Sequence, residues 1–210
     1  LHAKNLDKFS KANDIANYIS GVILLNNNKY QKSYGYFKKL TGLERSHATY
    51  SLKYLYSLVN SGKINLAYNY SKKLNNEQLD SFESDLVIGI YYLINSKFDL
   101  ANKSFLRAKK RNSGITINEY VADSLLIFSN LDNISFEKAS LSLSQLDTRF
   151  ENLNKIQKVF LNCYFNLSQT EEVFNDLVSE QKTDFSRYNY FYALFLKDKG
   201  KKRKASKIIN

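Results

Sequence analysis

Side chains that could act as nucleophiles or metal ligands are few and widely separated in this sequence. Cys163 is the single cysteine, and His2 and His47 are the two histidines. A catalytic cysteine needs a base beside it, and a zinc site needs several Cys or His ligands at close spacing. Neither arrangement is visible, and neither is a phosphate-binding loop or a nucleophile elbow. We therefore expect a non-catalytic protein with no metal or cofactor, in which Cys163 is a small core residue.

Contact with phosphate groups is a second chemistry that the sequence could support. The segment Lys197 to Lys207 reads "KDKGKKRKASK", and the whole chain has a formal net charge of +11. Such a charge favours acidic partners, nucleic acid or an anionic surface. However, a composition rich in Lys, Asn, Ile and Tyr, without Pro or Trp, is also what an AT-rich genome produces without selection for binding. Both explanations stay open at this point.

The elements that must position these residues are predicted to be helices. A hydrophobic content of 43% and an aromatic content of 14% indicate a folded core. The chain has no proline and only seven glycines, and its apolar residues recur at helical spacing. The apolar run "LVIGIYYLI" at Leu86 to Ile94 is too short to span a bilayer. The chain begins at Leu1 and contains no Met, so we expect a segment of a longer protein. Its compartment is unknown, with the cytoplasm slightly favoured.

A period of 34 residues runs through the small and apolar positions. Three registers show this period, namely Ser33, Ala67 and Ala101, then Phe37, Ser71 and Phe105, and then Leu40, Leu74 and Ala108. A fourth register holds Asn28, Gly62 and Ser96, which are residue types that form turns. We expect each repeat to be a pair of helices that buries its apolar face against the next pair.

On these residues the chain resembles the tetratricopeptide repeat family, as a divergent, bacterial-type helical-repeat protein. The 34-residue signature of that family is W-x2-L-G-x2-Y, then A-x3-F, then P. The third copy matches best, with Asp85-x2-Ile88-Gly89-x2-Tyr92 followed by Ala101-x3-Phe105-x2-Ala108. The chain departs from the family at the Trp place, which holds Asn17, Ser51 and Asp85, and in lacking the closing Pro.

The resemblance implies an all-α fold, an α-solenoid of about six antiparallel helical hairpins in a right-handed superhelix. Residues 1–13 are expected to form an N-terminal flank or partial helix. Residues 14–115 are expected to form three well-matched repeats. Residues 116–210 are expected to form divergent repeats that end inside the last helix, all within one continuous domain.

The resemblance also implies which residues face a partner. In this family the first helix of each repeat lines the concave side, and four places in it point inward. Those places give the candidate partner-binding residues Tyr18, Val22, Leu25, Leu52, Tyr56, Val59, Leu86, Ile90, Tyr120, Lys158, Arg187 and Tyr190. An apolar part followed by a basic part would suit an extended peptide with hydrophobic residues and then acidic ones. Alternatively, a tight superhelix or a preceding part of the protein covers the apolar stripe.

The function implied by the resemblance is that of a scaffold or adaptor that binds a peptide or helix of a partner protein in its concave groove. The carboxylate clamp of chaperone-tail binders is not expected, because its places hold Tyr18, Val22, Lys53, Glu83 and Val87. The alternative is an RNA-binding or anionic-surface-binding helical-repeat protein, with nucleic acid or an anionic membrane surface as the partner. The pentatricopeptide RNA binders have a similar period, but the glycine in the first helix and Ala-x3-Phe-x2-Ala in the second favour the protein-binding relative.

Overall fold

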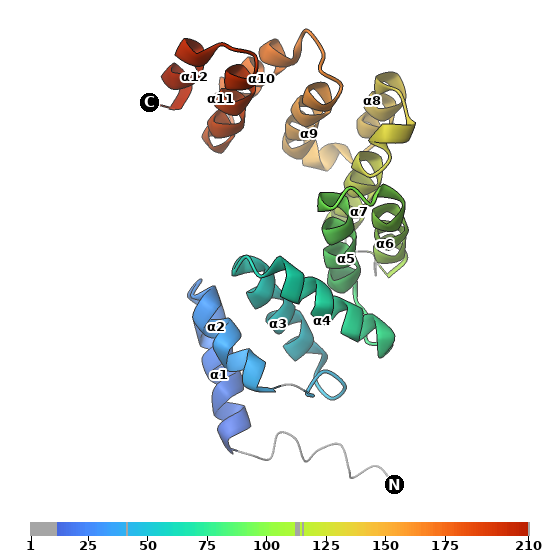
Figure 1. Cartoon of the computed structure of the whole chain (residues 1–210), viewed down its shortest axis with the longest axis vertical. Helices are drawn as coiled ribbons and strands as arrows, with labels where there is room; N and C mark the ends of the chain where they lie inside the picture. The colour runs from blue at the N-terminus through green and yellow to red at the C-terminus, as the bar shows by residue number, and fades with distance from the viewer. Residues whose placement is uncertain (1–11, 41, 112–113, 115, 210) are drawn as a thin grey trace. The chain divides into compact units, whose positions relative to one another are not determined.

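The computed structural model of the chain describes residues 12–40, 42–111, 114 and 116–209 (Figure 1). Over these residues the protein contains twelve α-helices and no β-strand, so the predicted all-α class is confirmed. The chain divides into two compact units, Leu1–Ser129 and Asn130–Asn210, which we describe one at a time. None of the described helices is long and apolar enough to cross a membrane.

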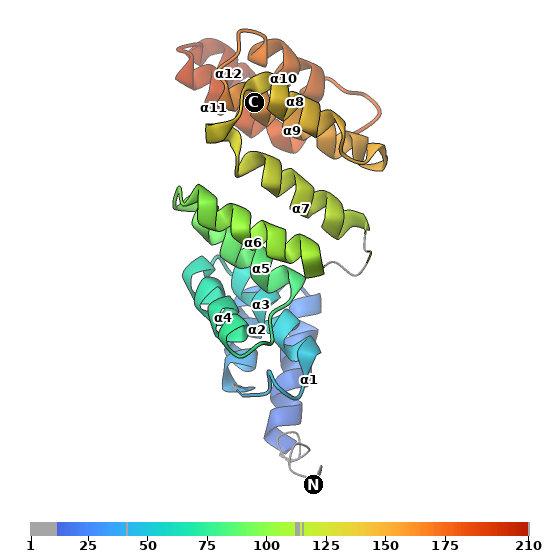
Figure 2. The same ribbon diagram turned by 90° about the vertical axis from the view of Figure 1, so that its right-hand side faces the viewer.

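The first unit is a series of helices whose starting points follow the 34-residue period. They are α1 (Ala12–Asn26), α2 (Tyr30–Phe37), α3 (Ala48–Asn60), α4 (Ile64–Asn76), α5 (Phe82–Ile94), α6 (Phe98–Arg111) and α7 (Thr116–Phe128), with the 3-10 turn η2 (Lys38–Leu40) after α2. Helices α2, α4 and α6 begin 34 residues apart, and so do α3, α5 and α7. Each helix packs on the next one along the chain (Figures 1 and 2).

The short turns between α1 and α2, α3 and α4, and α5 and α6 are closed in the same way. Their central residues have a positive φ of 57° at Asn28, 69° at Gly62 and 55° at Ser96. The N–H of the following lysine then donates to a carbonyl five residues back, from Lys29 to Leu24 at 2.8 Å, Lys63 to Leu58 at 3.0 Å and Lys97 to Tyr92 at 2.8 Å. This closure satisfies carbonyls at the end of the first helix of each pair. The register of turn-forming residues seen in the sequence is therefore a register of real turns.

Close packing within a pair depends on glycine opposite phenylalanine. A Cβ atom placed on Gly21 would lie 2.7 Å from Phe37 Cε1, and Gly89 faces Phe105 in the same way. Both phenylalanines are completely buried. The small residues one turn earlier in the second helices, Ser33, Ala67 and Ala101, are also completely buried. The ring thus occupies the space that a side chain on the first helix would otherwise fill.

Tyrosine rings build much of the core between pairs in the first unit. The Tyr50 ring packs edge-on against Phe37, and its hydroxyl donates to the Phe37 carbonyl at 3.1 Å. The Tyr54 ring stacks on Tyr50 and meets Tyr70 of α4 edge-on at 4.7 Å between centroids. Burial raises the pKa of Tyr54 to about 12, with smaller contributions from Tyr34 and Glu44.

Asp85 of α5, which the sequence comparison aligned with the tryptophan of the tetratricopeptide signature, is the centre of a buried ion-pair cluster. The Asp85 carboxylate is fully buried and accepts from Arg107 Nε and Arg111 Nε, each at 2.9 Å. Arg111 also pairs with Asp80. Burial raises the pKa of Asp85, and Arg107 opposes that rise. A polar residue is tolerated at this place because both arginines of α6 reach it.

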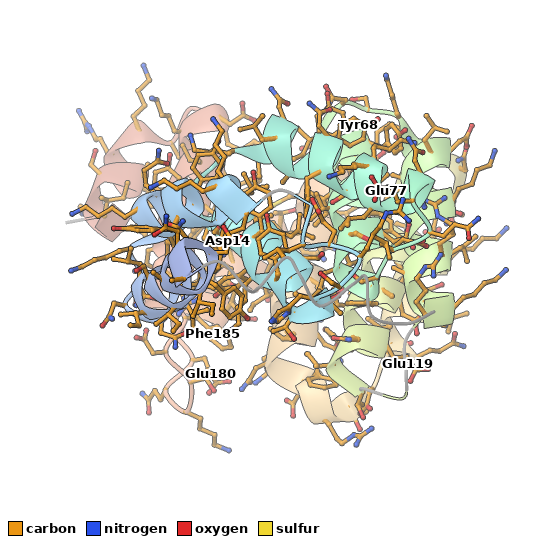
Figure 3. The ribbon with its side chains drawn as sticks, turned by 90° about the horizontal axis from the view of Figure 1, so that it is seen from below. Asp14, Tyr68, Glu77, Glu119, Glu180 and Phe185 are labelled. Atoms are coloured by element: carbon orange, nitrogen blue, oxygen red, sulfur yellow. The ribbon has the colours of Figure 1, made fainter. Side chains whose placement is uncertain are left out.

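A second aromatic contact joins α4 and α5. The Tyr68 ring, labelled in Figure 3, stacks on Tyr91 with the centroids 3.9 Å apart. The Tyr68 and Tyr92 hydroxyls lie 3.2 Å apart, within hydrogen-bond distance.

The second unit holds α8 (Phe136–Ser144), α9 (Glu151–Tyr164), α10 (Thr170–Val178), α11 (Asn189–Asp198) and α12 (Lys202–Ile209), with the 3-10 turns η3 (Leu131–Asn133), η4 (Thr148–Phe150) and η5 (Ser186–Tyr188). Helices that follow one another pack together here as well. The same turn closure recurs at Asn166 and Gly200, 34 residues apart, with φ of 52° and 75°. Cys163 is half-buried among apolar side chains, and burial raises the pKa of its thiol to about 11.

Candidate partner-binding groove

A groove with a volume of ≈ 640 Å³ runs along α3 in the first unit, between the end of α1 and the first half of α5. Helix α3 supplies most of its lining. The lining residues are Leu25, Asn26, Asn28, Thr49, Leu52, Lys53, Leu55, Tyr56, Val59, Asn60, Glu83 and Val87. All of them belong to the first unit, so the groove is a feature of that unit alone.

The floor of the groove is an exposed apolar stripe on α3. Leu52, Tyr56 and Val59 are spaced i, i+4 and i+7, which places them on one face of a helix. Their side chains are 39%, 53% and 37% exposed, whereas Tyr54 and Leu58 on the other face are buried. Helix α3 is therefore apolar nearly all round, and one of its two apolar faces is left open.

The Tyr56 ring is held at the edge of this floor by a neighbouring aromatic ring. Tyr30 of α2 meets it edge-on, with ring centroids 6.1 Å apart and an interplanar angle of 77°. The Tyr30 hydroxyl donates at 2.7 Å to Oδ1 of Asn28 in the preceding turn. The turn between α1 and α2 thus helps to position Tyr56, the most exposed side chain of the floor.

The rim of the groove is polar and carries two charges. The side-chain N–H of Asn60 donates to the Tyr56 carbonyl at 2.9 Å. The Oδ1 atom of Asn60 stays available as an acceptor. Lys53 on α3 and Glu83 in the first turn of α5 are the two charged lining residues. Within the described part of the chain, neither one makes an ion pair or a hydrogen bond through its side chain. Both charges are therefore available to an incoming group.

Four of the residues predicted to contact a partner line this groove, namely Leu25, Leu52, Tyr56 and Val59. Leu25 contributes little surface, because it is only 7% exposed. Three other predicted residues are partly buried and do not line the groove. Tyr18 lies against His47 and Phe37, and Val22 and Leu86 pack on the buried clusters. Ile90 is exposed on α5 outside the lining set.

The resemblance to the tetratricopeptide family predicts that Tyr120 faces a partner, but its side chain is not at the surface. Its side chain on α7 is only 4% exposed. Burial of so large an aromatic side chain is strongly favourable. The structure therefore places it in the core and leaves no surface there for a partner.

The remaining predicted residues, two of them basic, lie in the second unit. Lys158 is exposed on α9, Arg187 is exposed in η5, and Tyr190 on α11 is 58% exposed. Phe191 and Leu194 on α11 are exposed apolar residues as well. The Phe191 ring is held edge-on by Phe160 of α9 at 5.6 Å between centroids.

Sequence reasoning missed the polar half of the groove. The sequence analysis gave Asn28 only a turn role and assigned none to Asn26 or Asn60. The available signal was the repeated placement of polar residues at the ends of the first helices, beside the inward-facing apolar positions. Among the described residues, no group of three or more His, Cys, Asp or Glu side chains is arranged to hold a metal ion.

Comparison with known proteins gives no relative, because no protein-family model and no curated protein matches the chain. The function must therefore be argued from the groove itself.

Proposed function

We propose that this chain is a divergent tetratricopeptide-repeat protein, a right-handed α-solenoid of about six helical hairpins. The 34-residue spacing of helix starts supports this proposal, as does the turn closure that recurs at the same spacing at Asn28, Gly62 and Ser96 and again at Asn166 and Gly200. The buried glycine–phenylalanine pairs are further support, because they repeat the close-packing places of that family.

In this proposal the protein is a non-catalytic scaffold or adaptor that binds a segment of another protein in the groove along α3. The observation that carries the proposal is the open face formed by Leu52, Tyr56 and Val59. Contiguous exposed apolar side chains with a polar border are typical of contact surfaces. Covering them releases roughly 25 cal/mol for each Å² of apolar surface removed from water.

A second candidate function, the binding of RNA or another anionic surface, is favoured by the basic end of the second unit. Lys201 and Lys204 pair with Glu171, and Lys199 contacts the Asn166 side chain. Lys197, Lys202, Arg203 and Lys207 are exposed and, within the described residues, have no such acidic partner. Phosphate groups would be attracted to these four side chains.

One pull-down from native lysate tests the two candidates against each other. The immobilised full chain is compared with Leu52→Asp/Val59→Asp and with Leu66→Asp, with and without nuclease. Leu66 is a matched control because it is 44% exposed on α4 and does not line the groove. We expect a partner protein that the wild type and Leu66→Asp retain, that the groove variant loses and that nuclease does not release.

If Leu52→Asp/Val59→Asp retained the partner protein as well as the wild type does, the groove would be refuted as the binding site. Retention that nuclease abolishes, and that Lys202→Glu/Arg203→Glu weakens, would instead support the second candidate. Circular dichroism of each variant shows whether a lost partner reflects lost folding.

A further inference from the structure

The chemistry of the groove along α3 narrows the kind of segment that fits it, and this step rests on the proposed function. We propose that the occupant is an amphipathic α-helix of about three turns. Its apolar side chains would cover Leu52, Tyr56 and Val59. Its two flanks would carry opposite charges, with an acidic side chain facing Lys53 and a basic one facing Glu83.

A helical occupant follows from what the groove can offer to a peptide backbone. The walls are α3, α5 and the end of α1, so the groove presents no strand edge with which an extended segment could pair. Each backbone group left unpaired over the apolar floor would cost about 1–3 kcal/mol. The rim could pair few of these backbone groups, because one Asn60 N–H already donates to Tyr56 and Asn28 Oδ1 already accepts from Tyr30, which leaves Asn60 Oδ1 as an acceptor. A helix pairs its own backbone groups and presents only side chains.

The dimensions of the groove agree with this kind of ligand. The lining residues of α3 extend from Thr49 to Asn60, which is about 16 Å along the helix axis at 1.5 Å per residue. Three turns of a partner helix have the same length. The floor residues at i, i+4 and i+7 match the spacing by which amphipathic helices insert their anchors into grooves. The volume of ≈ 640 Å³ suits several anchor side chains rather than a whole helix, which would lie above the floor.

The two rim charges determine the charge pattern of the helix. Lys53 and Glu83 are on different helices, α3 and α5, and neither is neutralised within the described residues. A helix that carried one sign of charge on both flanks would bring a like charge to one of them. Complementary flanks avoid that repulsion and select one orientation of the bound helix.

The test is a selection from a phage library of random peptides of about 16 residues, long enough for three to four helical turns. The target is the full chain. We expect enriched sequences with apolar residues at helical spacing, acidic residues along one flank and basic residues along the other. A synthetic peptide of the leading sequence should bind at least about tenfold more weakly to Leu52→Asn or Val59→Asn, which corresponds to about 1.4 kcal/mol. Leu66→Asn should bind as the wild type does, and a central proline in the peptide should abolish binding.

The same selection also tests whether Lys53 and Glu83 determine the charges on the two flanks of the bound helix. Selection against Lys53→Glu should replace the acidic flank by a basic one, and Glu83→Lys should do the converse. Both side chains are on the rim, so neither change should disturb the core. Enriched charges that do not respond to either variant would overturn the assignment.

The outcomes separate this inference from the function on which it rests. Peptides that need Leu52 and Val59 but contain proline, or lack helical spacing, would overturn the helical occupant and leave segment binding intact. If no selected peptide depends on Leu52 or Val59, both the inference and the proposed function fail.

Discussion

The contact between Gly89 and Phe105 predicts that Gly89→Ala lowers the free energy of unfolding. Gly89 lies inside α5, and a Cβ atom added there would be 2.6 Å from Phe105 Cδ1, 2.9 Å from Cζ and closer still to Cε1. Carbon atoms in contact normally stay about 3.5–4.0 Å apart. The ring would therefore have to move by about 1 Å, and it is completely buried. Gly89→Ala should consequently strain the pair formed by α5 and α6.

The magnitude follows from two opposing effects. Overpacking a core costs about 1–3 kcal/mol, and the upper end applies here because three ring atoms are crowded at once. Replacing a helical glycine by alanine otherwise stabilises by about 1 kcal/mol. The expected net result is a loss of about 2 kcal/mol in the free energy of unfolding. Gly35→Ala is the matched control, because Gly35 lies in α2 with no atom near its Cβ position, and it should gain about 1 kcal/mol.

Urea unfolding followed by circular dichroism measures both changes, and a double-mutant cycle identifies their cause. Phe105→Leu removes the part of the ring that the new Cβ atom meets. Gly89→Ala should therefore cost at least about 1 kcal/mol less in the Phe105→Leu background than in the wild type. If Gly89→Ala stabilised the protein as Gly35→Ala does, the inference that Phe105 of α6 leaves no room for a Cβ atom on α5 would be refuted.

Three further predictions concern the turns, the tyrosine core and the second unit. Ser96→Gly should raise the free energy of unfolding by about 1 kcal/mol, because φ is 55° there and a side chain in that conformation costs about 1–2 kcal/mol; an unchanged urea midpoint would contradict this. Burial raises the pKa of Tyr54 from about 10 to about 12, so its stabilising contribution is complete below pH 10 and is lost as the pH rises to about 12. Tyr54→Phe should therefore make the loss of stability between pH 10 and pH 12 shallower, by an amount on the order of 1–3 kcal/mol; identical pH profiles would be evidence against a buried hydroxyl. Thr170→Val should lower the free energy of unfolding by about 1 kcal/mol, measured by thermal unfolding, because the buried Thr170 hydroxyl donates to the Leu167 carbonyl at 2.7 Å. Ser168→Ala, at an exposed neighbouring position, should lower it by less than half as much.

The helical class and the 34-residue period could be obtained from the sequence because both are local properties. Helical spacing of apolar residues depends on the geometry of one chain segment, and Asn28, Gly62 and Ser96 occur where a positive φ is needed. The buried register of Ser33, Ala67 and Ala101 was visible for the same reason, since only small residues fit where two helices approach closely.

The groove required the tertiary structure, because exposure depends on which side chains of other helices cover a given face. Helix α3 is apolar nearly all round, so its sequence does not say that Tyr54 is buried and Tyr56 exposed. The family pattern predicted an exposed position for Leu52, Val59 and Tyr120 alike, but Leu52 and Val59 are exposed in the groove whereas the Tyr120 ring lies in the core.

The net charge of the chain can be obtained from the sequence, but the pairing of individual charges depends on the tertiary structure. Sequence alone shows a basic chain, but it does not show that Arg107 and Arg111 are engaged by the buried Asp85 while Lys53 and Glu83 are unengaged at the rim of a groove. Periodicity determined which residues form helices and turns, since that information lies within a few residues of each position. The packing of α1, α3 and α5 decided which of their apolar and charged side chains are left open to a partner, since burial is a property of neighbours that are distant in the sequence.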